Sequence, residues 1–223
     1  MIRASLHHSG NIFLTALKAY DRCLEEAKDP EKFKQSEQPI IALFFSQIYL
    51  EAFINEIIFK SYCNGSKSNV DFINLDYLIS IKPTLGRISL AQKYQYVKKT
   101  LTNEFYEKGR NPFQDFELLI KLRNHIIHLQ PSETDDDCME WSEPEFVDFL
   151  ASKGLMPRRD IEAGPDLYQR MRTTELARWA CITALNMAQS IADCFPPGSD
   201  KDTLNKRVET FFKRIDEINE SNK

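Results

Sequence analysis

The segment KLRNHIIHLQP, residues 121–131, brings an arginine, an asparagine and two histidines together at the end of an apolar stretch. Histidine is the side chain best suited to proton transfer near neutral pH, and arginine presents a planar fork of donors to carboxylate or phosphate oxygens. The segment is therefore either a site of proton-transfer chemistry or the polar end of a helix. The sequence around this segment, and the helices it predicts, bear on which interpretation is correct.

Helical geometry predicts a polar stripe that runs through this segment. Glu117, Lys121, Asn124 and His128 are spaced by four, three and four residues, so they share one face of an ideal helix. Apolar residues cover much of the remaining surface: Phe113, Phe116, Leu118, Leu119, Ile120, Leu122, Ile126 and Ile127. The stripe must therefore face water, a ligand or a partner, and we take Glu117 and Lys121 as candidate supporting residues.

Arg123 lies off this stripe, about 140° from His128. A guanidinium that is buried needs a carboxylate or several acceptors. Glu51 is the candidate partner, because Gln47, Glu51 and Asn55 form a polar line on an otherwise apolar helix and a core-facing carboxylate needs a cation. We therefore expect an Arg123–Glu51 contact, in which Glu51 orients Arg123.

A structural interpretation of the same residues stays open. Arg123 would then be an ion-pair partner only, and His125 and His128 would be polar residues near a helix C-terminus, where a cation is mildly favoured. An arginine, an asparagine directly after it and a histidine at this spacing occur together by chance in roughly one chain of this size in a hundred.

Composition indicates a soluble helical protein. The chain has 223 residues, 42% apolar and 28% charged, and only seven glycines, which argues against a turn-dense all-β fold. A net charge of −4 excludes a general basic coat for nucleic acid, so any polyanion site must be local. The five cysteines form no C-x-x-C pair and are expected to be reduced thiols: Cys23, Cys63, Cys138, Cys181 and Cys194.

The chain is expected in the cytoplasm, away from membranes. The segment MIRASLHHSGN lacks the order of a signal peptide, and the most apolar run, residues 40–60, contains Gln47, Glu51, Asn55 and Glu56. That run is predicted to be a buried core helix. Because no phosphate-cradling glycine loop, nucleophile elbow or metal-binding histidine spacing occurs, we expect no metal and no cofactor.

The apolar periodicity predicts an all-α fold in a single domain spanning residues 1–223, with its core at about 11–195. The likeliest position for a domain boundary is around residues 131–145, but the signal there is weak and a single domain is favoured. Expected helices cover about residues 11–28, 39–62, 89–101, 111–129, 143–155, 165–194 and 201–219.

The run from Arg123 to His128 resembles the R-[polar]-x-x-x-H motif of the HEPN superfamily, and residues 42–59 resemble the early core helix of many of its domains. The resemblance covers residues 11 to about 195. It implies an antiparallel helical bundle, here with additional C-terminal helices, in which two protomers pair so that both motifs line one cleft. It also implies RNA cleavage without a metal, with Arg123 and His128 catalytic and Asn124 as the polar residue that orients or binds. His125 falls at a variable position and receives no role.

The implied chemistry needs two histidines. An RNA 2′-OH that attacks its own phosphate requires a base, an acid for the leaving 5′ oxygen and a cation for the growing charge. One catalytic histidine per chain supplies only one proton task, so a homodimer is part of the hypothesis. The resemblance also implies an antitoxin or regulatory protein as a partner. The tyrosine that often follows the motif in members silenced by a nucleotidyltransferase is replaced by Gln130, which argues against that kind of modification.

Three further groups were weighed. Asp135, Asp136 and Asp137 lack the spacing of a calcium loop and are expected to be a solvated acidic loop, and His7 and His8 belong to the N-terminal end. Basic residues interleaved with aromatic ones could bind single-stranded RNA, or could be the two faces of an amphipathic helix with its loop: Lys82, Arg87, Lys93, Lys98, Lys99, Lys108, Arg110 and Lys121 with Tyr94, Tyr96, Phe105 and Tyr106.

Two functional hypotheses follow. The first is a metal-independent endoribonuclease of HEPN type, a toxin or defence effector, which acts as a homodimer through Arg123, Asn124 and His128. The second is a non-catalytic HEPN-like helical dimer that binds nucleotide, RNA or a protein partner. The intact arginine, asparagine and histidine favour the enzyme, whereas the net acidity and the acidic loop favour the binding protein.

Overall fold

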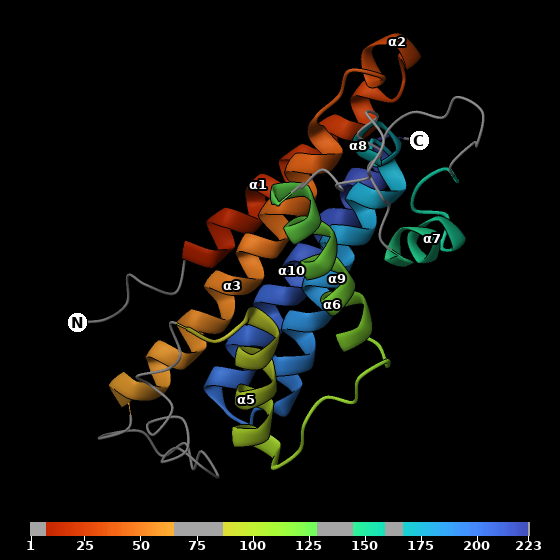
Figure 1. The fold of residues 1–223 in the computed structure, drawn as a ribbon. Helices are drawn as coiled ribbons and strands as arrows, with labels where there is room; N and C mark the ends of the chain where they lie inside the picture. Colours follow the sequence, from red (N-terminus) through yellow and green to blue (C-terminus); the bar gives the residue numbers. More distant parts are fainter. Residues whose placement is uncertain (1–7, 65–86, 129–144, 159–166, 223) are drawn as a thin grey trace, which may run out of the picture.

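The computed structural model describes residues 8–64, 87–128, 145–158 and 167–222, and all regular secondary structure within them is helical (Figure 1). The predicted all-α fold is confirmed. The helices in these ranges are α1 (His8–Glu26), α2 (Pro30–Phe33), α3 (Gln38–Asn64), α5 (Leu90–Thr102), α6 (Phe113–Ile127), α7 (Glu145–Ser152), α8 (Leu167–Arg170), α9 (Thr174–Cys194) and α10 (Ser199–Ser221).

Local capping explains where several helices begin. The Ser89 side chain accepts from the Gln92 backbone N–H and the Gln92 side chain accepts from that of Ser89, a capping box that starts α5. Asp29 caps α2, a short helix with Pro30 in its first turn that the apolar pattern did not predict. The expected bounds of the longer helices agree with the structure to within about three residues, except at α9.

The single helix expected over about residues 165–194 is wrong. The structure has α8 and α9, separated at Met171–Thr173. The Thr173 hydroxyl accepts from the Leu176 backbone N–H and donates to the Leu155 carbonyl at 2.6 Å. A threonine that caps a new helix adopts extended backbone geometry, so the preceding helix cannot continue through it.

Four long helices form the body of the bundle. α1, α3, α9 and α10 lie side by side along its length, and α5 and α6 pack across α3 and α9 (Figure 1). The core contains an aromatic cluster in which Phe13 meets Tyr49 and Phe211 at ring-centroid distances of 4.6 and 4.9 Å. One face of α9 is buried and lined by small residues: Ala177, Ala180, Ala184, Ala188 and Ala192.

Residues Gln38–Lys60 of α3 are long and apolar enough to cross a membrane by composition alone, but core helices pass the same test. In the structure α3 packs against α1, α5, α6 and α9, and Leu43, Leu50 and Ile54 are fully buried. This packing agrees with the expected core helix. The cytoplasmic location stays a prediction.

A shielded polar cluster joins three helices at the end of the bundle where α1 begins. The Glu56 carboxylate accepts from the Ser9 backbone N–H at 2.7 Å and from the Ser9 hydroxyl at 2.8 Å. Arg207 of α10 donates to the same carboxylate at 3.3 Å. Since the Glu56 and Arg207 side chains are only 13% and 17% exposed, the loss of either group leaves poorly solvated partners behind.

We predict that Glu56→Gln lowers the free energy of unfolding by about 2 kcal/mol, because it removes a shielded charge that three donors share. Urea unfolding monitored by circular dichroism measures the change. Glu51→Gln, on the same helix, is the matched control: its ion pair is long and Glu51 is half-exposed, so we expect a change below about 0.5 kcal/mol. Equal effects of the two substitutions would contradict the assigned role of Glu56.

We also predict that Cys23 and Cys181 resist alkylation in the folded protein. Burial raises the pKa of both thiols to about 12, and the thiolate is the reactive form. Iodoacetamide at about pH 8 should leave both unmodified in native protein and modify both in denaturant, as read by peptide mass spectrometry. Rapid native labelling of either cysteine would show that the α1–α9 contact opens readily.

Candidate functional site

The orientation of α6 is fixed by its apolar face. Phe116, Leu119 and Leu122 are fully buried, and the Phe116 ring packs 4.7 Å from that of Tyr94 on α5. At the start of the helix Phe113 stacks on Tyr106 at 5.1 Å. Because these side chains point into the bundle, the opposite face of α6 turns outward.

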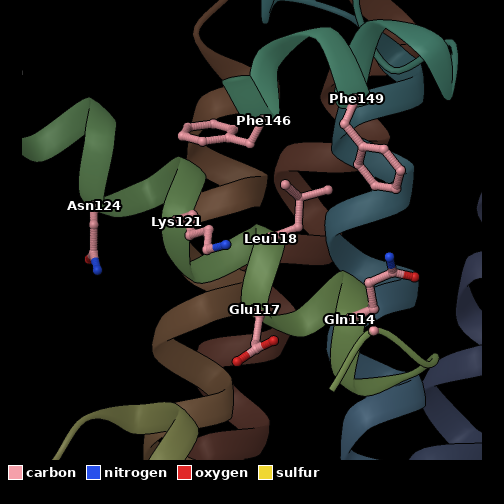
Figure 2. A pocket seen from close by; sticks show the side chains of 8 residues that line it. Gln114, Glu117, Leu118, Lys121, Asn124, Phe146 and Phe149 are labelled. Carbon is pink, nitrogen blue, oxygen red and sulfur yellow. The ribbon is translucent and has the colours of Figure 1, made fainter. Parts of the chain in front are cut away.

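The outward face of α6 forms one wall of a pocket of about 790 Å³. Glu117, Lys121 and Asn124 of the predicted stripe line it, together with Gln114, one turn earlier. The other wall comes from α7, whose Phe146 and Phe149 face this stripe (Figure 2). Leu118 forms part of the apolar lining. His128, the last residue of the predicted stripe, does not line the pocket.

Contacts at both ends hold α7 in place. Val147 and Leu150 are buried, and the Lys153 ammonium lies 2.5 Å from the Asp115 carboxylate in the first turn of α6. The same ammonium lies 5.0 Å from the centre of the Phe149 ring, an attractive cation–π contact. Lys153 therefore positions an aromatic wall residue as well as the helix that carries it.

Arg123 and His128 of the motif lie beyond the pocket, at the C-terminal end of α6. The Arg123 Nη1 donates to the Asn124 Oδ1 at 3.0 Å, whereas within the described chain its Nε is buried and makes no hydrogen bond. His128 is exposed, and its backbone N–H donates to the Asn124 carbonyl at 2.9 Å. His125 is half-buried with its ring edge-on to Phe146 at 5.8 Å. Asn124 thus joins the pocket to the guanidinium.

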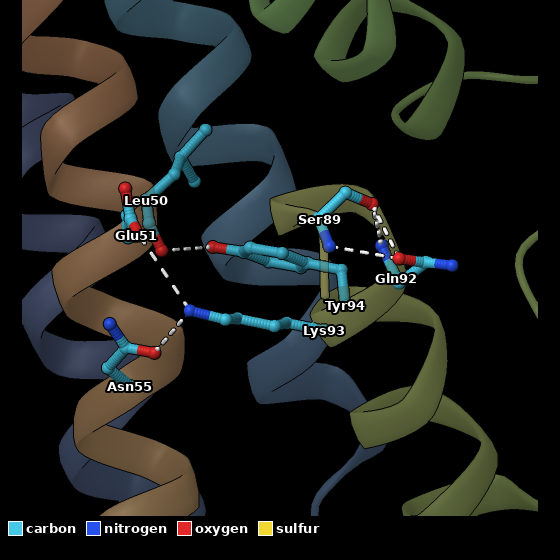
Figure 3. A network of polar contacts seen from close by, with 7 residues as sticks. All are labelled: Leu50, Glu51, Asn55, Ser89, Gln92, Lys93 and Tyr94. Carbon is cyan, nitrogen blue, oxygen red and sulfur yellow. Dashed lines mark hydrogen bonds and ion pairs between the residues drawn. The ribbon is translucent and has the colours of Figure 1, made fainter. Parts of the chain in front are cut away.

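The expected Arg123–Glu51 contact is wrong. Glu51 is 49% exposed and pairs with Lys93 of α5 at 3.7 Å, and Lys93 also donates to Asn55 at 3.1 Å (Figure 3). The Tyr94 hydroxyl donates to the Leu50 carbonyl beside them. Glu51 and Asn55 on α3 therefore face α5, and their polar partner is Lys93 of α5 and not a residue of α6. Gln47, in contrast, is buried as a core-facing residue.

The basic and aromatic residues around α5 are mostly the two faces of an amphipathic helix. Tyr94 and Tyr106 are buried, with Lys98 above the Tyr106 ring, and Lys93 is buried as well. Phe105 is exposed beneath Lys99. This arrangement favours the amphipathic interpretation over an extended stacking surface. Lys82, His7 and residues 135–137 lie outside the described residues, and His8 is exposed at the start of α1.

Metal chemistry has no ligand set in the part of the chain that the structure describes: no three histidine, cysteine or acidic side chains there come together as a candidate site. What the pocket offers instead is hydrogen bonding and aromatic stacking. Gln114, Phe146 and Phe149 were missed in the sequence. The signal for Gln114 was its position three residues before Glu117, on the same stripe.

The fold and site together define an all-α bundle with a polar and aromatic pocket next to an Arg-Asn-His motif. Comparison with protein-family models, with curated proteins and with solved structures gave no match to the chain.

We predict that Lys153→Met loosens α7 without unfolding the bundle. The Lys153–Asp115 pair is the charged contact between α7 and α6 described above, and its loss should speed backbone amide exchange in residues 146–152 about fivefold. Hydrogen–deuterium exchange with mass spectrometry measures this. Lys34→Met, which removes an exposed pair with Glu31, should leave α7 unchanged. Unaltered exchange in Lys153→Met would show that Val147 and Leu150 hold α7 by themselves.

Proposed function

We propose that this protein is a metal-independent endoribonuclease that acts as a homodimer of HEPN-like protomers. The observation that carries the proposal is the arrangement at the end of α6. An exposed imidazole, His128, follows Asn124 by one helical turn, and Asn124 holds the Arg123 guanidinium through a 3.0 Å hydrogen bond. These groups can reach a ligand, since they are not enclosed in the core.

The proposed reaction is transesterification at an RNA phosphate. The 2′ oxygen attacks the neighbouring phosphorus while one imidazole takes its proton, and the bond from phosphorus to the 5′ oxygen breaks as a second imidazole protonates that oxygen. The products are a 2′,3′-cyclic phosphate and a 5′-hydroxyl. Arg123 would hold the non-bridging oxygens, whose negative charge grows during the attack.

Two copies of the chain would supply the two imidazoles. His128 is the proposed catalytic histidine, and Ile127 directly before it is 43% exposed. Ile48 is also exposed, and the helix that carries it, α3, packs against α6. Pairing of two protomers near these side chains would remove apolar surface from water and bring two His128 side chains toward one cleft.

We predict that the purified protein cleaves a mixed-sequence single-stranded RNA in the presence of EDTA, and that His128→Ala and Arg123→Ala each lower the rate at least about 100-fold. Gel electrophoresis measures the rate, and end analysis should find 2′,3′-cyclic phosphates. His8→Ala is the matched control: it removes an exposed histidine at the start of α1 and should keep full activity. Specific activity should fall on dilution as dimers separate.

Three outcomes would contradict this proposal. Cleavage that survives His128→Ala would point to a contaminating nuclease, and cleavage abolished by EDTA would point to a metal enzyme. RNA that stays intact with a folded dimer would favour the second candidate, a helical dimer that binds nucleotide or RNA without cutting it. The Glu117 and Lys121 side chains, which line the pocket and pair with no other described residue, would be consistent with that function.

A further inference from the structure

We propose that the pocket between α6 and α7 is a subsite for the base of one RNA nucleotide, and that it selects guanine. The inference rests on the proposed function, because it assigns the pocket to a nucleotide next to the cleaved phosphate. It uses residues that the motif does not include: Glu117, Lys121, Phe146 and Phe149.

The first support is that aromatic and aliphatic side chains line a pocket large enough for a nucleotide. Phe146 and Phe149 come from one face of α7, three residues apart, and the Leu118 side chain of α6 points toward them (Figure 2). Aromatic side chains bind unstacked bases of single-stranded RNA by stacking. A volume of about 790 Å³ has room for a nucleotide, since ligand pockets commonly span about 300–1,000 Å³.

The second support is a pair of opposite charges that do not neutralise each other. Glu117 and Lys121 are four residues apart, the spacing at which such side chains usually pair on a helix. Here the carboxylate and the ammonium point in different directions (Figure 2), and neither side chain has an ion pair or hydrogen bond with another described residue. Both therefore remain available to a ligand in the pocket.

The order of these charges matches one base. The Watson–Crick edge of guanine presents, in order, the donors N2–H and N1–H and then the O6 acceptor. A carboxylate can accept from both donors at once, and an ammonium can donate to O6. Adenine and cytosine offer a carboxylate only one amino group, and uracil has a single N–H between two acceptors. Guanine alone uses both Glu117 oxygens and Lys121 together.

The third support is the connection to the motif. Asn124 lines the pocket and accepts a hydrogen bond from Arg123. A nucleotide whose base occupies the pocket would therefore place its phosphate toward the guanidinium of Arg123, five residues before His128. The expected consequence is cleavage next to guanine.

Titration of the intact protein with the four nucleoside 5′-monophosphates, followed by calorimetry, tests the pocket without any RNA cleavage. We expect guanosine 5′-monophosphate to bind at least tenfold more tightly than the other three. Glu117→Gln should abolish this preference, and Phe146→Ala should weaken all four nucleotides alike. Glu209→Gln, an exposed substitution on α10, is the control and should leave binding unchanged. Equal affinity for the four nucleotides, no binding at millimolar concentration, or an unaltered preference in Glu117→Gln would overturn the inference.

Cleavage-site mapping separates this inference from the function on which it rests. RNA cut without base preference, combined with absent binding of guanosine 5′-monophosphate, would refute the guanine subsite and leave the endoribonuclease intact. Guanine-selective binding by a protein that leaves RNA uncut would refute the endoribonuclease and retain the nucleotide site. Cutting next to guanine that becomes unselective in Glu117→Gln is the expected result.

Discussion

The close packing of helices around α9 is the constraint on which the rest of the molecule depends. Ala180, Ala184 and Ala188 are fully buried, and side chains this small let neighbouring backbones approach closely. α9 consequently contacts α1, α3, α5, α6 and α10. Bulkier residues on this face would push those helices apart, and α6, which packs on both α3 and α9, would lose the support that sets its orientation.

The candidate site follows from this packing. Because Phe116, Leu119 and Leu122 are buried in the core, the polar stripe on the opposite face of α6 points away from the core. The stripe alone would be a solvated helix face. It becomes a pocket because α7, attached through Lys153 and Asp115, sets two phenylalanine side chains opposite it.

Local periodicity was sufficient to predict the fold and one wall of the site. The helical spacing of Glu117, Lys121 and Asn124 predicts a shared face, and all three line the pocket. Local periodicity could not predict contacts between residues that are far apart in the sequence. Whether Lys93 or Arg123 pairs with Glu51 depends on which helix lies beside α3 at that level. Phe146 and Phe149 look like core residues in the sequence, since any short amphipathic helix carries such a pair.

Asn124 links the two parts of this site, the pocket and the motif at the end of α6. Its side chain lines the pocket and accepts from Arg123, and its backbone carbonyl accepts from His128. Loss of its amide is therefore expected to disturb the proposed binding and the proposed cleavage together. Glu117 lies two turns earlier on α6 and contacts neither Arg123 nor His128 in the described structure. The proposed recognition of a ligand in the pocket can for this reason be varied at Glu117 separately from the proposed chemistry at the end of α6. That separation makes the two proposed roles distinguishable.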